Sequence, residues 1–459
     1  MSTRAVVVML AITLLLGGAA FVALRKPAVS EASTGPLLTF DPARVVALRM
    51  RGADGKEQAI ERVGDEWLVR VGGPSERVNG AWPAGMQTVR GGLRFLAALV
   101  PERAETAPGE IGSRDLGDSV RLDITLNDGT SRVLRVAPRA VGGLVLASGS
   151  NAGKSAEGSE RVGWVSADLH GLLVASGLKA WRDPAAIPGL GPDVWRISLN
   201  AGGAEVEVAR QQGRWSLRKP IQAPADAEAI DRLVRRLASV TVVDYLDEGA
   251  AAGAQTDAAT VEVEWAERGE AGGEPRRWIR RLVIGSATDL GGRTVSARAE
   301  VQRGAGPTER RQISVLAEPL AELRADAAAL VSRRSIEAPA ADVGQMEIRM
   351  CDGSGPPRIV VRTLDGWTLD GRPTSKDDAG AVEGLLLVLA SAKAAQVVIG
   401  DGPPLTQPMC LTIATVGATP IAEAKIGIVE GGGVAIRVGE VTRVYAEPAA
   451  ATAHAWLAR

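Results

Sequence analysis

The stretch Gly213-Arg214-Trp215-Ser216-Leu217 shows the pattern around which the chain is organised, because a turn signal that leads into a short strand headed by Trp occurs three times. The other two copies contain Trp67 and Trp367. The three Trp residues are 148 and 152 residues apart. A pattern that returns at a nearly constant spacing indicates an internal repeat, so we expect three related units in tandem.

An amphipathic helix is expected after each of these strands. Apolar residues recur at i, i+3, i+4 and i+7 after two of the Trp strands, and the first unit fits if seven residues are inserted around 79–83. Gly92 interrupts the first copy. The residues on this face are Val89, Leu93 and Leu96, then Ile230, Leu233, Val234 and Leu237, then Val382, Leu385, Leu386 and Leu389.

The rest of each unit reads as strands and a closing helix. Two strand-like stretches precede each Trp strand and more follow each helix, of which Val120–Leu126 alternates most clearly with period two. Stretches rich in Ala or Leu close the units at 167–180, 317–331 and 447–457. This order predicts an α+β fold: three tandem repeats of mixed, largely antiparallel sheet with two helices each. The expected repeat units are 41–191, 192–341 and 342–459.

The N-terminus carries a topogenic signal. The twenty residues from Ala5 to Leu24 have no charge, and a helix of that length crosses the ~30 Å hydrocarbon core. We interpret 1–25 as a transmembrane signal anchor and 26–40 as a tether. The alternative is a cleaved signal peptide with Gly18, Ala19 and Ala20 at the processing site. Both interpretations export the rest of the chain.

Composition excludes several classes of partner. The 53 Lys and Arg residues nearly balance the 54 Asp and Glu residues, and a net charge of −1 offers no footprint for nucleic acid. An aromatic content of 3% also removes the stacking platforms that single strands need. Two Cys and two His cannot supply the four ligands of a structural zinc site.

One stretch comes close to a phosphate-binding loop. Ser148 to Ser155 ends in Gly-Lys-Ser and follows the apolar strand 144–147, but Ser148 replaces the first glycine of the motif. Such a loop must open a helix, whereas Gly158 and the strand-like Trp164-Val165 follow here. We therefore interpret the stretch as a hairpin loop.

Other candidate side chains are also better explained by structure than by catalysis. His170 and His454 have no Cys or second His nearby, so we expect surface or packing roles. Asp247-Glu248 and Asp377-Asp378 suggest an acid and base pair, but the latter follows Ser375 at the start of a helix, where capping is expected. We assign no catalytic, cofactor-binding or metal-ligating residue.

Tryptophan and cysteine give two further expectations. The three repeated Trp residues are expected in the core because they alternate with Leu or Val, while Trp82, in the insertion of the first unit, is the candidate for contact with a partner. Cys351 and Cys410 both fall in the third unit. They form a disulfide if their strands are neighbours, or else are two small apolar residues packed in a sheet.

These features together resemble a known family. The N-terminal span, the opening strand, the Trp-x-Leu strand followed by Lys219-Pro220 and the acidic helix start at Asp226 resemble the bacterial membrane-anchored family called domain of unknown function 4340. Arg372-Pro373 replaces the Lys-Pro pair in the third unit. The resemblance implies three tandem copies and a single-pass place in the bacterial inner membrane with the bulk of the chain extracytoplasmic. It also implies protein partners, because members are often encoded beside components of ABC-type transporters related to gliding-motility export systems.

The expected function is therefore that of a non-enzymatic, membrane-anchored, extracytoplasmic accessory or scaffold subunit with protein partners. The membrane contact is expected through Ala5 to Leu24, and no nucleic acid or cofactor is expected. The alternative is a ligand-binding module that uses a cleft between repeats. An exported enzyme is the weakest interpretation, because no nucleophile and base can be named.

Overall fold

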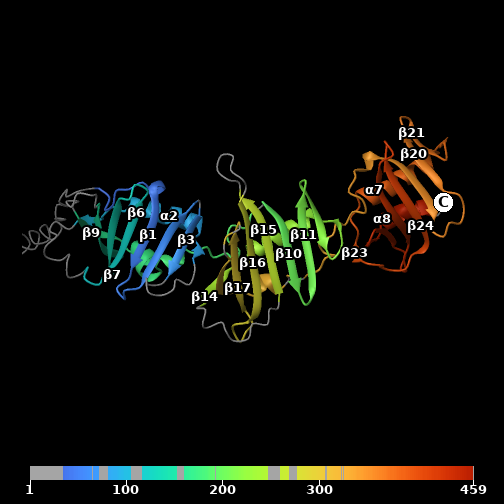
Figure 1. Ribbon diagram of the computed structural model, residues 1–459. Coiled ribbons are helices and arrows are strands. Elements are labelled where there is room, and N and C mark those ends of the chain that lie inside the picture. The colour runs from blue at the N-terminus through green and yellow to red at the C-terminus, as the bar shows by residue number, and fades with distance from the viewer. Residues whose placement is uncertain are drawn as a thin grey trace, which may run out of the picture. The chain divides into compact units, whose positions relative to one another are not determined.

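The computed structural model describes residues 35–64, 66–71, 81–104, 116–151, 160–191, 193–246, 259–267, 276–304, 306, 308–321, 323 and 325–457 (Figure 1). Two compact units divide the chain, Met1–Pro184 and Ala185–Arg459. In the described residues, one nine-stranded sheet lies in the first unit and two lie in the second. The unit boundaries expected near 191 and 341 stay predictions.

The first sheet is antiparallel throughout its described ladder. Its central strand pair, β1 and β6, joins two meanders, and the short edge strands β4 and β5 flank the helix α2 (Met86–Ala97) in the chain. In spatial order the strands are β4 (Trp82–Pro83), β3 (Glu66–Val71), β2 (Glu57–Val63), β1 (Val45–Arg51), β6 (Val120–Leu126), β7 (Ser131–Val141), β8 (Leu144–Ser150), β9 (Arg161–Ser166) and β5 (Arg103–Ala104).

The second sheet repeats this strand order around the helix α5 (Ala227–Ala238). Its strands are β13 (Ala223–Pro224), β12 (Arg214–Lys219), β11 (Ala204–Gln211), β10 (Val194–Ala201), β15 (Ala259–Glu267), β16 (Arg276–Ala287), β17 (Thr294–Arg303), β18 (Thr308–Leu316) and β14 (Val242–Leu246).

The third sheet has the same order again, with the helix α7 (Lys376–Ala390). Its strands are β22 (Arg372–Pro373), β21 (Gly366–Leu369), β20 (Arg358–Thr363), β19 (Val343–Met350), β24 (Thr406–Thr415), β25 (Pro420–Ile428), β26 (Val434–Val438), β27 (Val441–Tyr445) and β23 (Gln396–Ile399). Even the irregularities recur. In each sheet the strand that comes first in the chain, β1, β10 or β19, has a register shift at its start, between Val45 and Ala47, Val194 and Arg196, and Val343 and Gln345.

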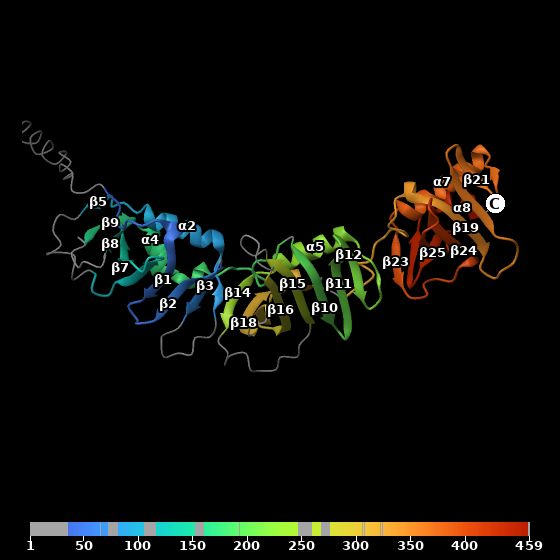
Figure 2. The same cartoon turned by 45° about the horizontal axis from the view of Figure 1, so that its top comes forward.

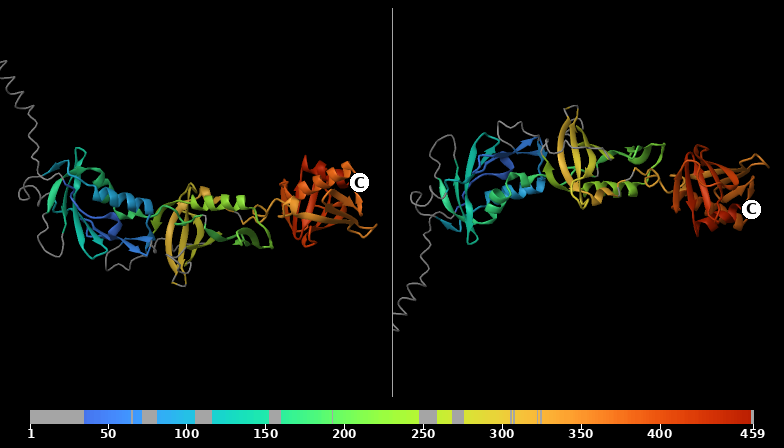
Figure 3. Two further views of the ribbon diagram at one scale, coloured as in Figure 1. Left: turned by 90° about the horizontal axis from the view of Figure 1, so that it is seen from above. Right: turned by 90° about the horizontal axis from the view of Figure 1, so that it is seen from below.

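One face of each sheet is covered by its long helix (Figures 2 and 3). The helix connects strands at opposite edges, so it crosses that face. Apolar residues at every second strand position meet the helix there, as Val120, Leu122 and Ile124 do in the core of the first sheet. The predicted helix faces are confirmed: those named above are buried, except that Val234 is half-buried.

The predicted α+β class with two helices per repeat is wrong. The structure is mostly β, with 49% strand and 19% helix. The closing stretch 167–180 contains only α4 (Asp168–His170) with the short π-helical and 3-10 turns Gly171–Ala175 and Leu178–Trp181. Among the described residues of stretch 317–331, which omit 322 and 324, α6 (Glu318–Ala321) is the only helix. Only α8 (Ala449–Leu457) is a longer closing helix.

Backbone pairing explains the lost helix of the second unit. Val331 forms a β-bridge with Ala225, and the carbonyl of Leu330 accepts a hydrogen bond from the N–H of Asp226 at 2.8 Å. Residues committed to these bonds cannot continue an Ala-rich helix. Tertiary hydrogen bonds have overridden a weak intrinsic preference.

The predicted location also needs correction. No helix among the described residues, which begin at 35, is long and apolar enough to cross a membrane. The described structure therefore gives no support to the predicted single-pass place in the bacterial inner membrane. The segment Ala5 to Leu24 lies outside the described residues.

The three repeated Trp residues occupy the strand next to the edge strand of each sheet. Trp67 and Trp367 are buried, as predicted, whereas Trp215 is half-buried. Each lies opposite an arginine that occurs five residues earlier in the sequence. In the third sheet the guanidinium of Arg362 stacks over the Trp367 ring at 4.6 Å from its centroid.

Candidate functional site

The stretch that resembles a phosphate loop begins inside a strand. Ser148 and Gly149 belong to β8, and Ser148 is buried between its partners Arg135 and Val162. The hairpin-loop interpretation is therefore wrong for Ser148 to Ser150. Residues 152–159, which contain the Gly-Lys-Ser end, lie outside the described residues.

The remaining candidates from the sequence do not converge. His170 makes a hydrogen bond at 3.0 Å to the carbonyl of Pro138, and His454 lies in α8. Ser375 caps α7, because its hydroxyl accepts from the N–H of Asp378 at 3.1 Å, which confirms the capping role. Asp247-Glu248 lies outside the described residues.

Trp82 was wrongly expected to face a partner. Its side chain is 1% exposed, and its indole nitrogen donates to the carbonyl of Asp183 at 2.8 Å. A β-bridge between Ala84 and Arg182 fixes the same crossing of chain segments. The insertion around 79–83 therefore supplies the edge strand β4 and a core anchor of the first unit.

The open face, by which we mean the face of each sheet opposite its long helix, carries charged side chains. In the second sheet Glu264 is 1% exposed and forms ion pairs with both Arg196 and Arg277. The distance from the Arg277 guanidinium to a Glu264 carboxylate oxygen is 2.5 Å. Arg196 also reaches Glu207 at 3.0 Å and Glu262 at 3.1 Å. These residues come from four neighbouring strands, so the ion pairs join β11, β10, β15 and β16.

A second acidic centre lies further along this face. Glu300 of β17 is buried and accepts from Arg281 at 3.2 Å and Arg298 at 3.1 Å, with Arg310 at 3.4 Å. The hydrogen bond with Glu207 raises the pKa of Arg196, and the same bond lowers the pKa of Glu207. These carboxylates are committed to arginine partners on neighbouring strands and are not placed to donate or accept a proton in a reaction. We therefore interpret this network as structural.

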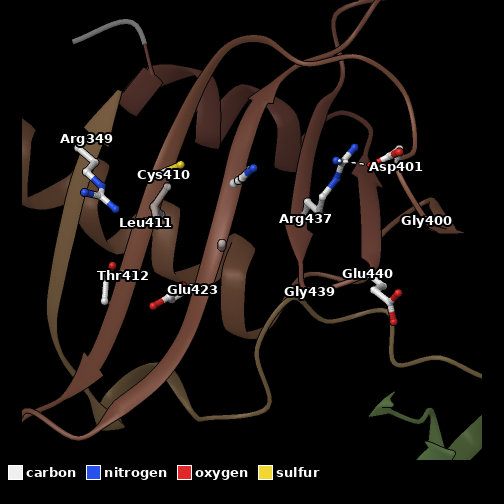
Figure 4. A pocket seen from close by; sticks show the side chains of 12 residues that line it. Arg349, Gly400, Asp401, Cys410, Leu411, Thr412, Glu423, Arg437, Gly439 and Glu440 are labelled. Atoms are coloured by element: carbon white, nitrogen blue, oxygen red, sulfur yellow. Dashed lines mark hydrogen bonds and ion pairs between the residues drawn. The ribbon is translucent and has the colours of Figure 1, made fainter. Parts of the chain in front are cut away.

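The third sheet has a pocket on its open face (Figure 4). Its volume is about 720 Å³, within the range of small-molecule sites. A smaller pocket of about 330 Å³ lies on the open face of the second sheet, over the ion pairs. The larger pocket is lined by Arg349, Gly400, Asp401, Cys410, Leu411, Thr412, Glu423, Ala424, Lys425, Arg437, Gly439 and Glu440.

The sequence did not point to this pocket. Arg349, Lys425 and Arg437 come from three different strands and fall at the polar positions of ordinary alternating patterns. Asp401 and Glu440 come from the connections between strands. Only the register of the sheet brings them together. Across the described residues, no group of three or more His, Cys, Asp or Glu side chains is arranged to hold a metal ion.

A disulfide lies at one side of the pocket. Cys351 and Cys410 are bonded, with their Cα atoms 5.1 Å apart. Of the two alternatives expected for these cysteines, the structure shows the disulfide, and β19 and β24 are neighbouring strands as that alternative requires. It ties the end of the first strand of the third sheet to a strand 59 residues later.

Comparison with known proteins finds a partial family match. The family model described as "Domain of unknown function (DUF4340)" matches residues 79–262. This confirms the resemblance over that part of the chain. The matched residues begin before α2 of the first sheet and end within β15 of the second, so the match does not follow the limits of one sheet.

Other comparisons add little. No curated protein matches the chain. Among solved structures, an endo-1,5-alpha-L-arabinanase from Thermotoga petrophila RKU-1 aligns at 10% identity over 89% of this chain and 100% of its own, with a TM-score of 0.10. A TM-score of this size shows no shared fold, so the alignment carries no argument.

Proposed function

We propose that the protein is a non-enzymatic scaffold or accessory subunit that holds other proteins on the open faces of its sheets. The observation that carries this proposal is the repetition of one strand order in three sheets, each with a helix on one face and charged side chains on the other. Three large, similar faces on one chain suit the binding of several partners or of one repetitive partner.

We further propose that the three sheets are copies of one unit. The common strand order, the recurring register shift and the Arg–Trp cross-strand pair support this. The resemblance to domain of unknown function 4340 supports partners in an ABC-type transport or gliding-related export assembly.

Photo-crosslinking tests the scaffold role. A photoreactive residue is placed singly at three exposed open-face positions, Arg135, Glu205 and Arg349, in cells that produce the full chain. Matched controls are exposed residues on the three long helices, Gln87, Arg232 and Glu383. We expect the open-face positions to capture subunits of an ABC-type transporter, identified by mass spectrometry, and the helix positions to capture none.

Capture from both sets alike, or from the helices alone, would show that the open faces are not the docking surfaces.

A second candidate function is favoured by one observation. The 720 Å³ pocket lies on a single sheet, so a ligand-binding role does not need the inter-repeat cleft expected from the sequence.

A further inference from the structure

The pocket of the third sheet is crossed by one row of cationic side chains. The register places Arg349 opposite Cys410, Cys410 opposite Lys425, and Lys425 opposite Arg437. Residues directly opposite one another point to the same face, with Cα atoms ~5 Å apart. The row therefore presents three cations on one face across four neighbouring strands.

Two of these cations have no acidic partner in the described part of the chain. Among the residues that the structure describes, neither Arg349 nor Lys425 makes an ion pair, and both are exposed. Lys425 lies opposite Arg437, and like charges in that position destabilise a sheet. Glu423 precedes Lys425 by two residues on β25 and lies opposite Thr412, so its acidic side chain is outside the row (Figure 4).

The guanidinium of Arg437 is held in place. Its Nε donates to the hydroxyl of Thr442 at 3.1 Å, and that hydroxyl donates in turn to the carbonyl of Gly400 at 3.4 Å. Thr442 is fully buried, whereas Asp401, which contacts Arg437 at 3.2 Å, is fully exposed. The arginine is thus oriented by a buried contact, and its acidic partner is free to move aside.

The equivalent row of the first sheet is treated differently. There Arg51, Arg121 and Arg135 lie opposite one another in turn. Arg51 pairs with Glu57, and Arg121 pairs with Asp123 at 2.7 Å. Among the described residues, two of the three cations in the first row are therefore paired with acids of the same sheet, whereas in the row over the pocket only Arg437 is paired.

We propose that this pocket binds a small ligand with two oxyanion groups, each a phosphate or a carboxylate. One oxyanion accepts hydrogen bonds from Lys425 and Arg437 together, and the fork of a guanidinium matches both kinds of group. The second oxyanion is held by Arg349, which is two strand spacings from Lys425, or ~10 Å. The site goes beyond the scaffold role, because it needs no protein partner.

Isothermal titration calorimetry of the full chain tests the proposal. The probes are pyrophosphate and succinate, titrated without divalent cations at constant ionic strength set with sodium chloride. We expect saturable binding of at least one probe at one site per chain, and the tighter probe identifies the group as phosphate or carboxylate. Binding of neither probe would overturn the proposal.

Variants locate the binding. Lys425→Gln and Arg437→Gln should each weaken affinity at least tenfold, because each removes a charged hydrogen-bond donor. Arg437→Lys keeps the charge without the fork, so its affinity should fall between those of wild type and Arg437→Gln. This variant also serves as a control for a disturbance of the loop at 400–402, which Arg437 contacts. Arg135→Gln removes an exposed open-face cation of the first sheet and should leave affinity within twofold of wild type. Equal weakening by Arg135→Gln, or none by the pocket variants, would refute the site.

Discussion

At the residue scale, two adjacent glycines of α2 differ in what they face. Gly92 is buried, and a Cβ atom at this position would lie 2.2 Å from the Trp181 ring. Gly91 has open space around its Cβ direction. The break in the apolar pattern at Gly92 is thus a place where an indole packs directly against helix backbone.

Gly92→Ala should therefore destabilise the first unit by about 1–3 kcal/mol, because overpacking forces the buried Trp181 to shift. The neighbouring change Gly91→Ala should instead stabilise it by up to about 1 kcal/mol through helix propensity. The thermal unfolding transition of the first unit measures the change in stability for both variants. Equal stability of the two variants would mean that the indole moves aside without cost.

At the element scale, the buried carboxylate of Glu264 joins three strands of the second sheet through Arg196 and Arg277. Removing one member of such a set leaves the others desolvated without a counter-charge. The exposed pair of Lys219 and Glu205, at 2.8 Å, belongs to the same sheet but remains in water. The two sites therefore allow a buried ionic contact to be compared with a surface one in the same sheet.

Glu264→Gln should lower local stability by about 2–3 kcal/mol, the scale of a hydrogen bond to a charged group. Glu205→Gln should change it by less than about 1 kcal/mol, as for other surface pairs. Hydrogen–deuterium exchange of peptides from β10, β15 and β16 gives the measurement, with faster exchange expected for the first variant alone. Unchanged exchange in Glu264→Gln would count against a structural role of the network.

The turn between β6 and β7 predicts a pH dependence. The hydroxyl and N–H of Thr130 and the nearby Arg44 lower the pKa of Asp128 from 3.8 to about 2. The ionised carboxylate therefore stabilises the turn above pH 4, and this contribution is lost as the pH falls from about 4 to about 2. Asp128→Asn should lower the urea midpoint of the first unit at pH 6, and the difference from wild type should shrink towards pH 2. A difference that is constant with pH would exclude the ionised form as its cause.

At the scale of the whole molecule, the disulfide links two segments of the third sheet. Replacing Cys351 and Cys410 by Ser opens a loop of 59 residues and should cost about 4 kcal/mol on the chain-entropy model. We expect the melting transition of the third sheet to move to lower temperature and that of the first unit, followed by its own peptides in exchange experiments, to stay in place. A shift of both would indicate that the units unfold together.

The local parts of this fold were readable from the sequence. Alternation with period two located strands such as Val120–Leu126 to the residue, and the 3.6-residue pattern located the buried face of α7. These signals survive because each depends on residues close together in the chain. The closing helices failed for the opposite reason, since distant backbone pairing at Val331 decided the conformation of an Ala-rich stretch.

By itself, then, the sequence determined which positions are apolar, where most of the longer strands and the long helices lie, and that one pattern occurs three times. Only the tertiary structure decided how the strands are ordered, that Trp82 is buried, and that Arg349, Lys425 and Arg437 share one row over a pocket. The physical reason is that side-chain alternation is a local property. Register is set instead by hydrogen bonds between strands far apart in the chain, and a slip of one residue would send each of these side chains to the other face.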